Sequence, residues 1–172
     1  MADDVIDEDE GYRRTIRRLA SLVDDPGITI GVHGKDNDPY KRGQGPAVTT
    51  AQIASFHEFG TLDRYEDSSP AGDGRPGVPQ RSFLRSTADE NRAKYSDLIS
   101  RGIGRVIDGT MTIDRALGLV GAKAVADVQK KIASGIEPEL TEAAIRSKVR
   151  RSTKPLIDTG QLRQAIDWQI DK

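Results

Sequence analysis

The sequence predicts an α+β fold in a single domain, with a long central helix and an extended flexible loop. Two short stretches, at 28–34 and 165–170, have the alternating or β-branched composition of strands. The segment 112–134 repeats apolar residues at helical spacing, and 61–79 is dense in Gly, Pro, Ser and Asp. A chain of 172 residues suits one domain with one core.

The composition bounds where the protein acts. Hydrophobic residues make up 35% and charged residues 31%, and no apolar run approaches the roughly 18 residues of a membrane-spanning helix. The first ten residues, MADDVIDEDE, lack the basic and apolar regions of a signal peptide. We therefore expect no membrane contact, and a protein that stays in the cytoplasm where it is made.

The residues that most metal sites and nucleophilic enzymes need are scarce. Cysteine is absent, and His33 and His57 are the two histidines, so we expect no metal and no cofactor. The pair His57–Glu58 resembles half of a zinc-protease motif, but no second histidine follows four residues after His57. The sequence therefore predicts a protein that is not an enzyme.

Charge is distributed unevenly along the chain. Residues 1–10 carry six carboxylates and no base, so a formal net charge of −1 leaves +5 for the remainder. We divide the chain into an acidic, flexible arm at 1–11 and a single domain at 12–172. The arm is either a solubilising tail or a segment that contacts a basic neighbour or lines a channel.

An amphipathic helix is predicted over 12–24, ended by Pro26 and Gly27. Its apolar face consists of Ile16, Leu19, Ala20 and Val23. Its basic face consists of Arg13, Arg14, Arg17 and Arg18. These arginines form a solvated face, a rim of subunit contacts, or a surface that meets phosphate.

A strand at 28–34 and a short helix follow. Thr49 or Thr50 caps the helix, which places Ile53, Phe56 and Phe59 toward the core. After it comes the predicted mobile loop at about 61–79, whose composition buries little apolar surface.

The second half of the chain is mainly helical. Phe83 and Leu84 anchor the chain before a helix capped by Ser86 or Thr87, which runs to about Val106 and lies exposed against a small sheet or a neighbour. Thr112 caps the long helix, and Gly135 ends it. The apolar face of that helix consists of Ala116, Leu119, Val120, Val125, Val128 and Ile132.

The last segment contains a short helix at 141–148, a basic loop, a turn at 158–160, and a strand through Ala165, Ile166, Trp168 and Ile170. The basic loop meets DNA or an acidic partner, or is exposed with no partner. Its cations are Arg146, Lys148, Arg150, Arg151 and Lys154.

Three short motifs carry a resemblance to a known family. They are HEFGT at 57–61, VPQRSFLRST at 78–87 and KPLIDTGQLRQAI at 154–166. Each is weak alone, but the ordered set, spanning about 28–170, resembles the neck or tail-completion proteins of long-tailed phages, the head-to-tail joining family. The N-terminal arm and the length of the 61–79 loop depart from a minimal member.

In this interpretation the motif residues are scaffold. An aromatic is buried at a helix end, glycines provide a left-handed cap and a reversal, and polar side chains bond turn amides. We expect these roles for Phe59, Gly60, Pro79, Phe83, Pro155, Leu156, Asp158, Thr159 and Gly160.

The resemblance implies a mostly antiparallel sheet packed by helices, and copies that form a closed ring of six or twelve in the virion neck. Such a ring joins the DNA-filled head to the tail, meets portal adaptor or neck proteins and tail terminator or tube proteins, and lets genomic DNA pass through its lumen. The protein would reside in the host cytoplasm during assembly and afterwards at the head-tail junction. Arg13, Arg14, Arg17, Arg18, Arg150 and Arg151 are candidate partner or DNA contacts.

Two other functions stay open beside the neck ring. A tail terminator ring capping the tail tube has the same architecture and different partners. A phage-encoded DNA-binding regulator would use the arginine helix and the 146–154 loop. A hydrolase using His57, Glu58 and an aspartate finds no nucleophile motif in the sequence.

Overall fold

The computed structural model describes residues 10–23, 26–39, 48–61, 77–148, 150 and 152–171. Most of the predicted arm, most of the predicted mobile loop, and Arg151 lie outside the described residues. The elements are α1 Glu10–Val23, β1 Gly27–Val32, the 3₁₀ helix η1 Gly34–Asp36, α2 Thr50–Phe59, α3 Leu84–Ile107, α4 Ile113–Ser134, α5 Glu142–Ser147, α6 Gln161–Ala165 and β2 Ile166–Asp171.

Strands from the two ends of the chain pair with each other. β1 and β2 run antiparallel, with Gly27 opposite Asp171 and Val32 opposite Ile166. They form a two-stranded sheet within the described part of the chain. A two-stranded sheet is too small to be stable alone, so it needs helices against one face. The predicted α+β fold, with an antiparallel sheet packed by helices and one long central helix, is confirmed.

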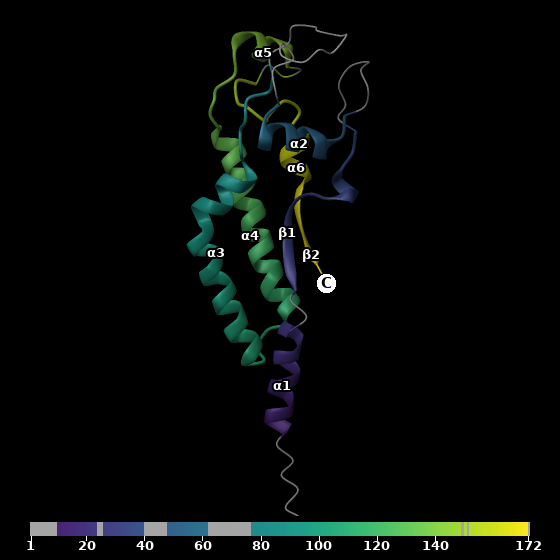
Figure 1. Cartoon of the computed structure of the whole chain (residues 1–172), viewed down its shortest axis with the longest axis vertical. Helices are drawn as coiled ribbons and strands as arrows, with labels where there is room; N and C mark the ends of the chain where they lie inside the picture. The colour runs from purple at the N-terminus through teal and green to yellow at the C-terminus, as the bar shows by residue number, and fades with distance from the viewer. Residues whose placement is uncertain are drawn as a thin grey trace, which may run out of the picture.

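α4 is the central helix, and it lies directly against the sheet (Figure 1). Thr112 caps it by accepting the backbone N–H of Arg115, and Gly135 follows its last turn with φ +100°, as the sequence predicted. A Cβ added to Gly121 would lie 2.7 Å from the ring of Trp168, so a bare backbone is what lets β2 approach the helix. Leu119, predicted on the buried face, is instead exposed because it lies away from the sheet and α3.

α3 covers the other side of α4, and the two helices form an antiparallel hairpin (Figure 1). Gly102 is buried where the helices meet, because a Cβ there would lie 3.0 Å from the Cβ of Ala116. α3 therefore packs on α4 rather than on the sheet, and the predicted contact of its exposed face with a neighbour stays a prediction. Its apolar residues are sparse because it packs along one narrow line on α4.

α1 lies at one end of the long axis, and α5 lies at the other (Figure 1). We call these the α1 end and the α5 end. α1 begins at Glu10, so Glu10 and Gly11, the last two residues of the predicted arm, belong to this helix. Arg18 joins α1 to the end of α3, because its Nη1 donates to the carbonyl of Ile107 at 3.2 Å. A cation there also interacts favourably with the negative C-terminal end of α3.

The core lies between the sheet and the α5 end. Fully or nearly buried side chains from four elements and two loops meet there and pack closely. They are Ala54, Phe83, Val128, Ile132, Leu156, Leu162 and Ile166.

Candidate functional site

The three sequence motifs, far apart along the chain, meet at the α5 end. Residues 57–61 end α2, residues 78–87 lead into α3, and residues 154–166 lead through α6 into β2. Hydrogen bonds join the first motif to the second, where the carbonyl of His57 accepts the N–H of Arg81 at 2.7 Å and the carbonyl of Glu58 accepts from the amide of Gln80 at 3.1 Å. Leu156 and Leu162 of the third motif pack in the same core cluster as Phe83. We call this region the motif hub.

The carboxylate of Glu58 caps the start of α3. Oε2 accepts the backbone N–H groups of Phe83 at 2.8 Å and Leu84 at 2.9 Å, and Oε1 accepts from Arg85 N–H at 3.1 Å and the hydroxyl of Ser82 at 2.5 Å. The first N–H groups of a helix have no partner within it, and a negative charge there is favourable. The predicted cap at Ser86 or Thr87 is therefore wrong, because the capping group comes from another helix.

Phe59 is not in the core. Its side chain is 68% exposed, and Phe56 is 42% exposed. The buried face of α2 instead consists of Thr50, Ala54 and Glu58, which are spaced four residues apart. The prediction that Phe59 is buried is wrong, whereas Phe83 is fully buried as predicted.

The ends of the 61–79 segment are held together. Thr61 N–H donates to the carbonyl of Val78 at 2.9 Å, and Val78 N–H donates to the hydroxyl of Thr61 at 2.7 Å. Gly60 ends α2 with φ +75° and ψ 173°, so it takes the positive φ expected of a glycine at this position, but not the predicted left-handed cap conformation. Pro79 is exposed. Hydrogen bonds thus join the two ends of the 61–79 loop.

Arg81 ties the second motif to the segment before α5. Its side chain is nearly buried, with Nε donating to the carbonyl of Pro138 at 2.7 Å and Nη2 to that of Glu139 at 3.2 Å. Burial lowers the pKa of Arg81, because it costs the guanidinium part of its hydration. Arg81 thus ties the second motif to the chain that leads into α5.

Lys148, the residue directly after α5, holds the third motif in place. Lys148 Nζ donates to the carbonyls of Lys154 at 2.5 Å and Ile157 at 2.8 Å. Between them, Pro155 and Leu156 are buried, and Leu156 has φ +61°. A non-glycine residue at positive φ is uncommon, so surrounding contacts must hold it there.

The Asp-Thr-Gly turn has the predicted polar contacts. Asp158 Oδ1 accepts the N–H of Arg150 at 3.3 Å, Thr159 Oγ1 accepts the N–H of Gln161 at 3.3 Å, and Gly160 has φ +87°. The turn leads into the short helix α6, which the sequence analysis missed. The sequence signal for α6 is the helical spacing of Leu162 and Ala165, which are both buried.

A cleft of about 820 Å³ opens in the motif hub. Its walls come from α2, the 77–81 segment, α5 and the third motif, and they are mostly apolar with a few charged groups. Apolar residues lining it include Val48, Ile53, Phe56, Leu140, Ala144 and Leu156. Charged and titratable residues lining it are His57, Arg81, Glu139, Lys148 and Asp158. Its size and character fit a binding site.

His57 is held neutral in this cleft. Burial, together with the smaller effects of the nearby charges of Arg81 and Lys148, lowers the pKa of His57 to about 4. Its Nδ1 is buried and has no hydrogen-bond partner in the described structure. Its neighbour Glu58 makes four hydrogen bonds at the start of α3, so the two side chains serve different sites and do not form an acid–base pair.

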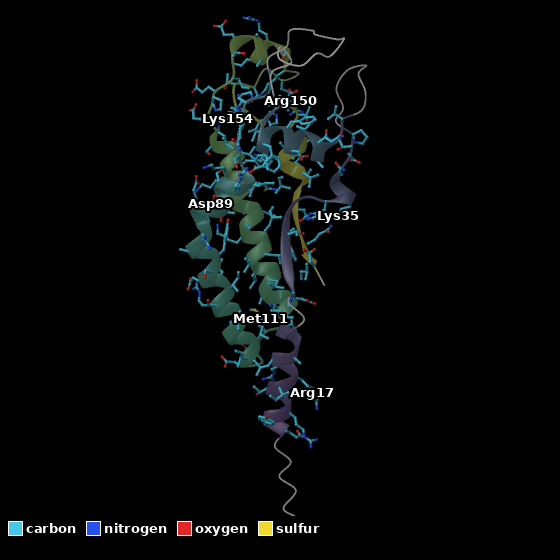
Figure 2. The ribbon with its side chains drawn as sticks, viewed as in Figure 1. Arg17, Lys35, Asp89, Met111, Arg150 and Lys154 are labelled. Carbon is cyan, nitrogen blue, oxygen red and sulfur yellow. The ribbon has the colours of Figure 1, made fainter. Side chains whose placement is uncertain are left out.

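The candidate contact arginines fall into two groups at opposite ends of the molecule, as Figure 2 shows for Arg17 and Arg150. Arg13, Arg14 and Arg17 are exposed on α1, and Arg14 pairs with Glu10 at 3.6 Å. Arg18 is half-buried against α3.

Within the described ranges, no three His, Asp or Glu side chains gather to hold a metal ion. No helix in the same residues has both the length and the apolarity to cross a membrane. No family model, no curated protein and no solved structure matches the chain.

Proposed function

We propose that this chain is a structural subunit that assembles with copies of itself into a closed ring, in the neck of a tailed phage where head and tail join. One observation carries the proposal: the elongated molecule exposes apolar side chains at both ends. At the α1 end, Tyr12 is 64% and Ile16 46% exposed. At the α5 end are two exposed side chains of α2, Phe56, which lines the cleft, and Phe59.

Two different apolar surfaces suit head-to-tail contacts. In such a contact, one surface of a copy meets a different surface of the next, and a ring results when the rotation closes. Exposed aromatic residues at the edge of a well-ordered site are the side chains that most often dominate binding energy. The three motifs that resemble the head-to-tail joining family support this assignment, because they build the cleft and position Phe59.

The neck position itself rests on the motif resemblance. The ring would meet a portal adaptor or neck protein on one face and a terminator or tube protein on the other, with DNA in the lumen. A tail terminator ring is the alternative, and its subunit would have the same contacts between copies. Nothing in this assignment calls on catalysis, since the motif residues support the backbone.

The test combines solution mass with imaging. We expect the purified chain to form species of six or twelve times its 18.8 kDa, alone or on its partners. We expect a label on this chain to appear at the head-tail junction of negatively stained particles. A label at the tail-tube end would indicate the terminator ring, and a chain missing from virions would overturn the structural role.

A DNA-binding regulator is the second candidate, favoured by the exposed arginines of α1. Arg17 and Arg150 lie at opposite ends of the long axis, so the two basic groups do not form one surface for a duplex (Figure 2). A regulator would bind DNA with an affinity that falls steeply with salt, in proportion to the phosphates contacted. A shallow salt dependence, unchanged by Arg17→Ala, would exclude it.

A further inference from the structure

One wall of the cleft in the motif hub is formed by a segment that adds no residue to the core cluster. Residues 137–147, which we call the strap, contain α5 and provide Leu140 and Ala144 to the cleft wall. The structure describes every residue of the strap, and none of their side chains is buried. Ile136, directly before the strap, packs against the core cluster. The strap therefore forms a wall of the cleft without an apolar anchor of its own.

Two cationic side chains hold the strap at its ends. Before α5, Arg81 donates to the carbonyls of Pro138 at 2.7 Å and Glu139 at 3.2 Å. After α5, Lys148 donates to two carbonyls of the third motif, at 2.5 and 2.8 Å. The first of these clamps reaches the strap from the second motif, and the second fixes the residue that follows the strap. Polar contacts at two points thus do the work that buried side chains do for the other walls.

Other contacts lie within the strap itself. Thr141 caps α5 by accepting the N–H of Ala144 at 3.2 Å, and its carbonyl accepts the N–H of Ile145 at 3.0 Å. Arg146 pairs with Glu142 across one turn at 3.2 Å. These contacts move with the strap, so they can persist when the strap leaves the cleft as a unit.

Lifting the strap exposes little apolar surface. Leu140 and Ala144 are half-buried, whereas Pro138 and Glu139 are already exposed. Water can therefore replace the guanidinium of Arg81 on the two exposed carbonyls. Regions with few buried apolar contacts and exposed hydrogen bonds open locally at a free energy well below that of global unfolding.

We propose that the strap swings away from the cleft as a unit while the rest of the fold stays in place, and that it thereby controls access to the apolar walls behind it. Those walls include Ile53 on α2 and Leu156 in the third motif. The inference goes beyond the proposed function and does not depend on it, because the strap, both clamps and the cleft belong to one copy of the chain.

Amide hydrogen exchange tests the strap in the full-length protein. The N–H of Ile145 reports on α5, and the N–H of Val128, a core residue of α4, reports on the whole fold. In the parent, we expect Ile145 to exchange at least about a hundredfold faster than Val128. Lys148→Met removes one clamp and should speed Ile145 by about tenfold while leaving Val128 unchanged. Lys130→Met, the same change at an exposed position of α4, should alter neither rate.

A thiol probe tests access to the cleft, because the chain contains no cysteine. Ala144→Cys places a thiol on the cleft side of the strap, and Ala143→Cys places one on its exposed side. With an aromatic disulfide reagent, we expect Ala144→Cys to react more slowly than Ala143→Cys. Adding Lys148→Met should speed Ala144→Cys by about tenfold and leave Ala143→Cys unchanged.

Three results would overturn the strap. The first is similar exchange of Ile145 and Val128 in the parent, which would mean that α5 opens with the whole fold. The second is equal acceleration of both amides by Lys148→Met, because the clamp would then hold the entire domain. The third is an unchanged reaction of Ala144→Cys in the Lys148→Met background. A chain that never assembles would overturn the proposed function and leave these measurements unaffected, so the two can fail separately.

Discussion

The carboxylate of Glu58 lies 2.8 Å from the backbone nitrogen of Phe83, so the last turn of α2 fixes the first turn of α3. The same carboxylate accepts from Leu84 and Arg85, and Phe83 is fully buried in the core cluster. The side chain of Glu58 thus adds to the backbone hydrogen bonds that join the first two motifs, and it orients α3.

Removing that carboxylate should destabilise the whole domain. We expect Glu58→Ala to lower the free energy of unfolding by about 3 kcal/mol, because several N–H groups lose their acceptor and some are buried. Glu58→Gln keeps one acceptor oxygen, so its free energy of unfolding should lie between those of the parent and Glu58→Ala. Urea unfolding followed by circular dichroism measures both, with Asp89→Ala on the exposed surface of α3 as control, expected within about 0.5 kcal/mol of the parent. Equal midpoints for Glu58→Ala and Asp89→Ala would contradict the cap.

The two motif phenylalanines should respond in opposite ways. Phe83→Ala empties a fully buried site and should cost about 3 to 5 kcal/mol. Phe59→Ala removes an exposed ring whose contact is Arg85, 5.6 Å from its centroid, and should change stability by less than about 1 kcal/mol. We expect Phe59→Ala to weaken assembly instead, measured as mass in solution. A large loss of stability in Phe59→Ala would place that ring in the core after all.

Close packing between α4 and the sheet predicts a contrast between two glycines. Gly121→Ala would force a methyl group to within 2.7 Å of the Trp168 ring, so we expect a loss of about 1 to 3 kcal/mol. Gly104→Ala, in α3, meets nothing within 4 Å and should stabilise the helix by about 0.5 to 1 kcal/mol. Thermal midpoints of the two variants should shift in opposite directions.

The buried His57 predicts a window of pH-dependent stability. Its pKa is 6.5 when unfolded and about 4 when folded, so the unfolded chain binds the proton first as pH falls. Its contribution is complete above pH 6.5, decreases toward pH 4, and amounts to at most about 3 kcal/mol. Denaturant midpoints across this window measure it. His57→Gln should flatten the profile.

Local signals in the sequence were enough for much of the fold. Thr112 and Gly135 mark the ends of α4 with a cap and a stop that act within a few residues. The β-branched pattern of β1 and the strand through Trp168 were also visible, since alternation is a property of neighbouring residues. These elements were therefore predicted with nearly correct bounds.

The misses at α2 and at the start of α3 share one physical cause, which is that the decisive contacts are distant in sequence. The buried face of α2 consists of Thr50, Ala54 and Glu58. Two of these side chains are polar because their hydrogen-bond partners lie elsewhere in the chain. The spacing of apolar residues predicts Phe56 and Phe59 on the buried face instead. Glu58 caps a helix 26 residues later, across the 61–79 loop. The three motifs of the site could be recognised in the sequence. The cleft could not, because it forms only where the third motif packs beside the other two in the folded chain.

The chain contains one tryptophan, and it lies at the joint between β2 and α4. Its fluorescence therefore reports the docking of the sheet on the central helix, while far-ultraviolet circular dichroism reports mainly the helices. Trp168 does not line the cleft at the α5 end, so we expect binding there to leave its emission unchanged, and an emission change during assembly would mean that the body itself deforms. The protein thus contains an intrinsic optical probe that separates ring formation from rearrangement of the subunit.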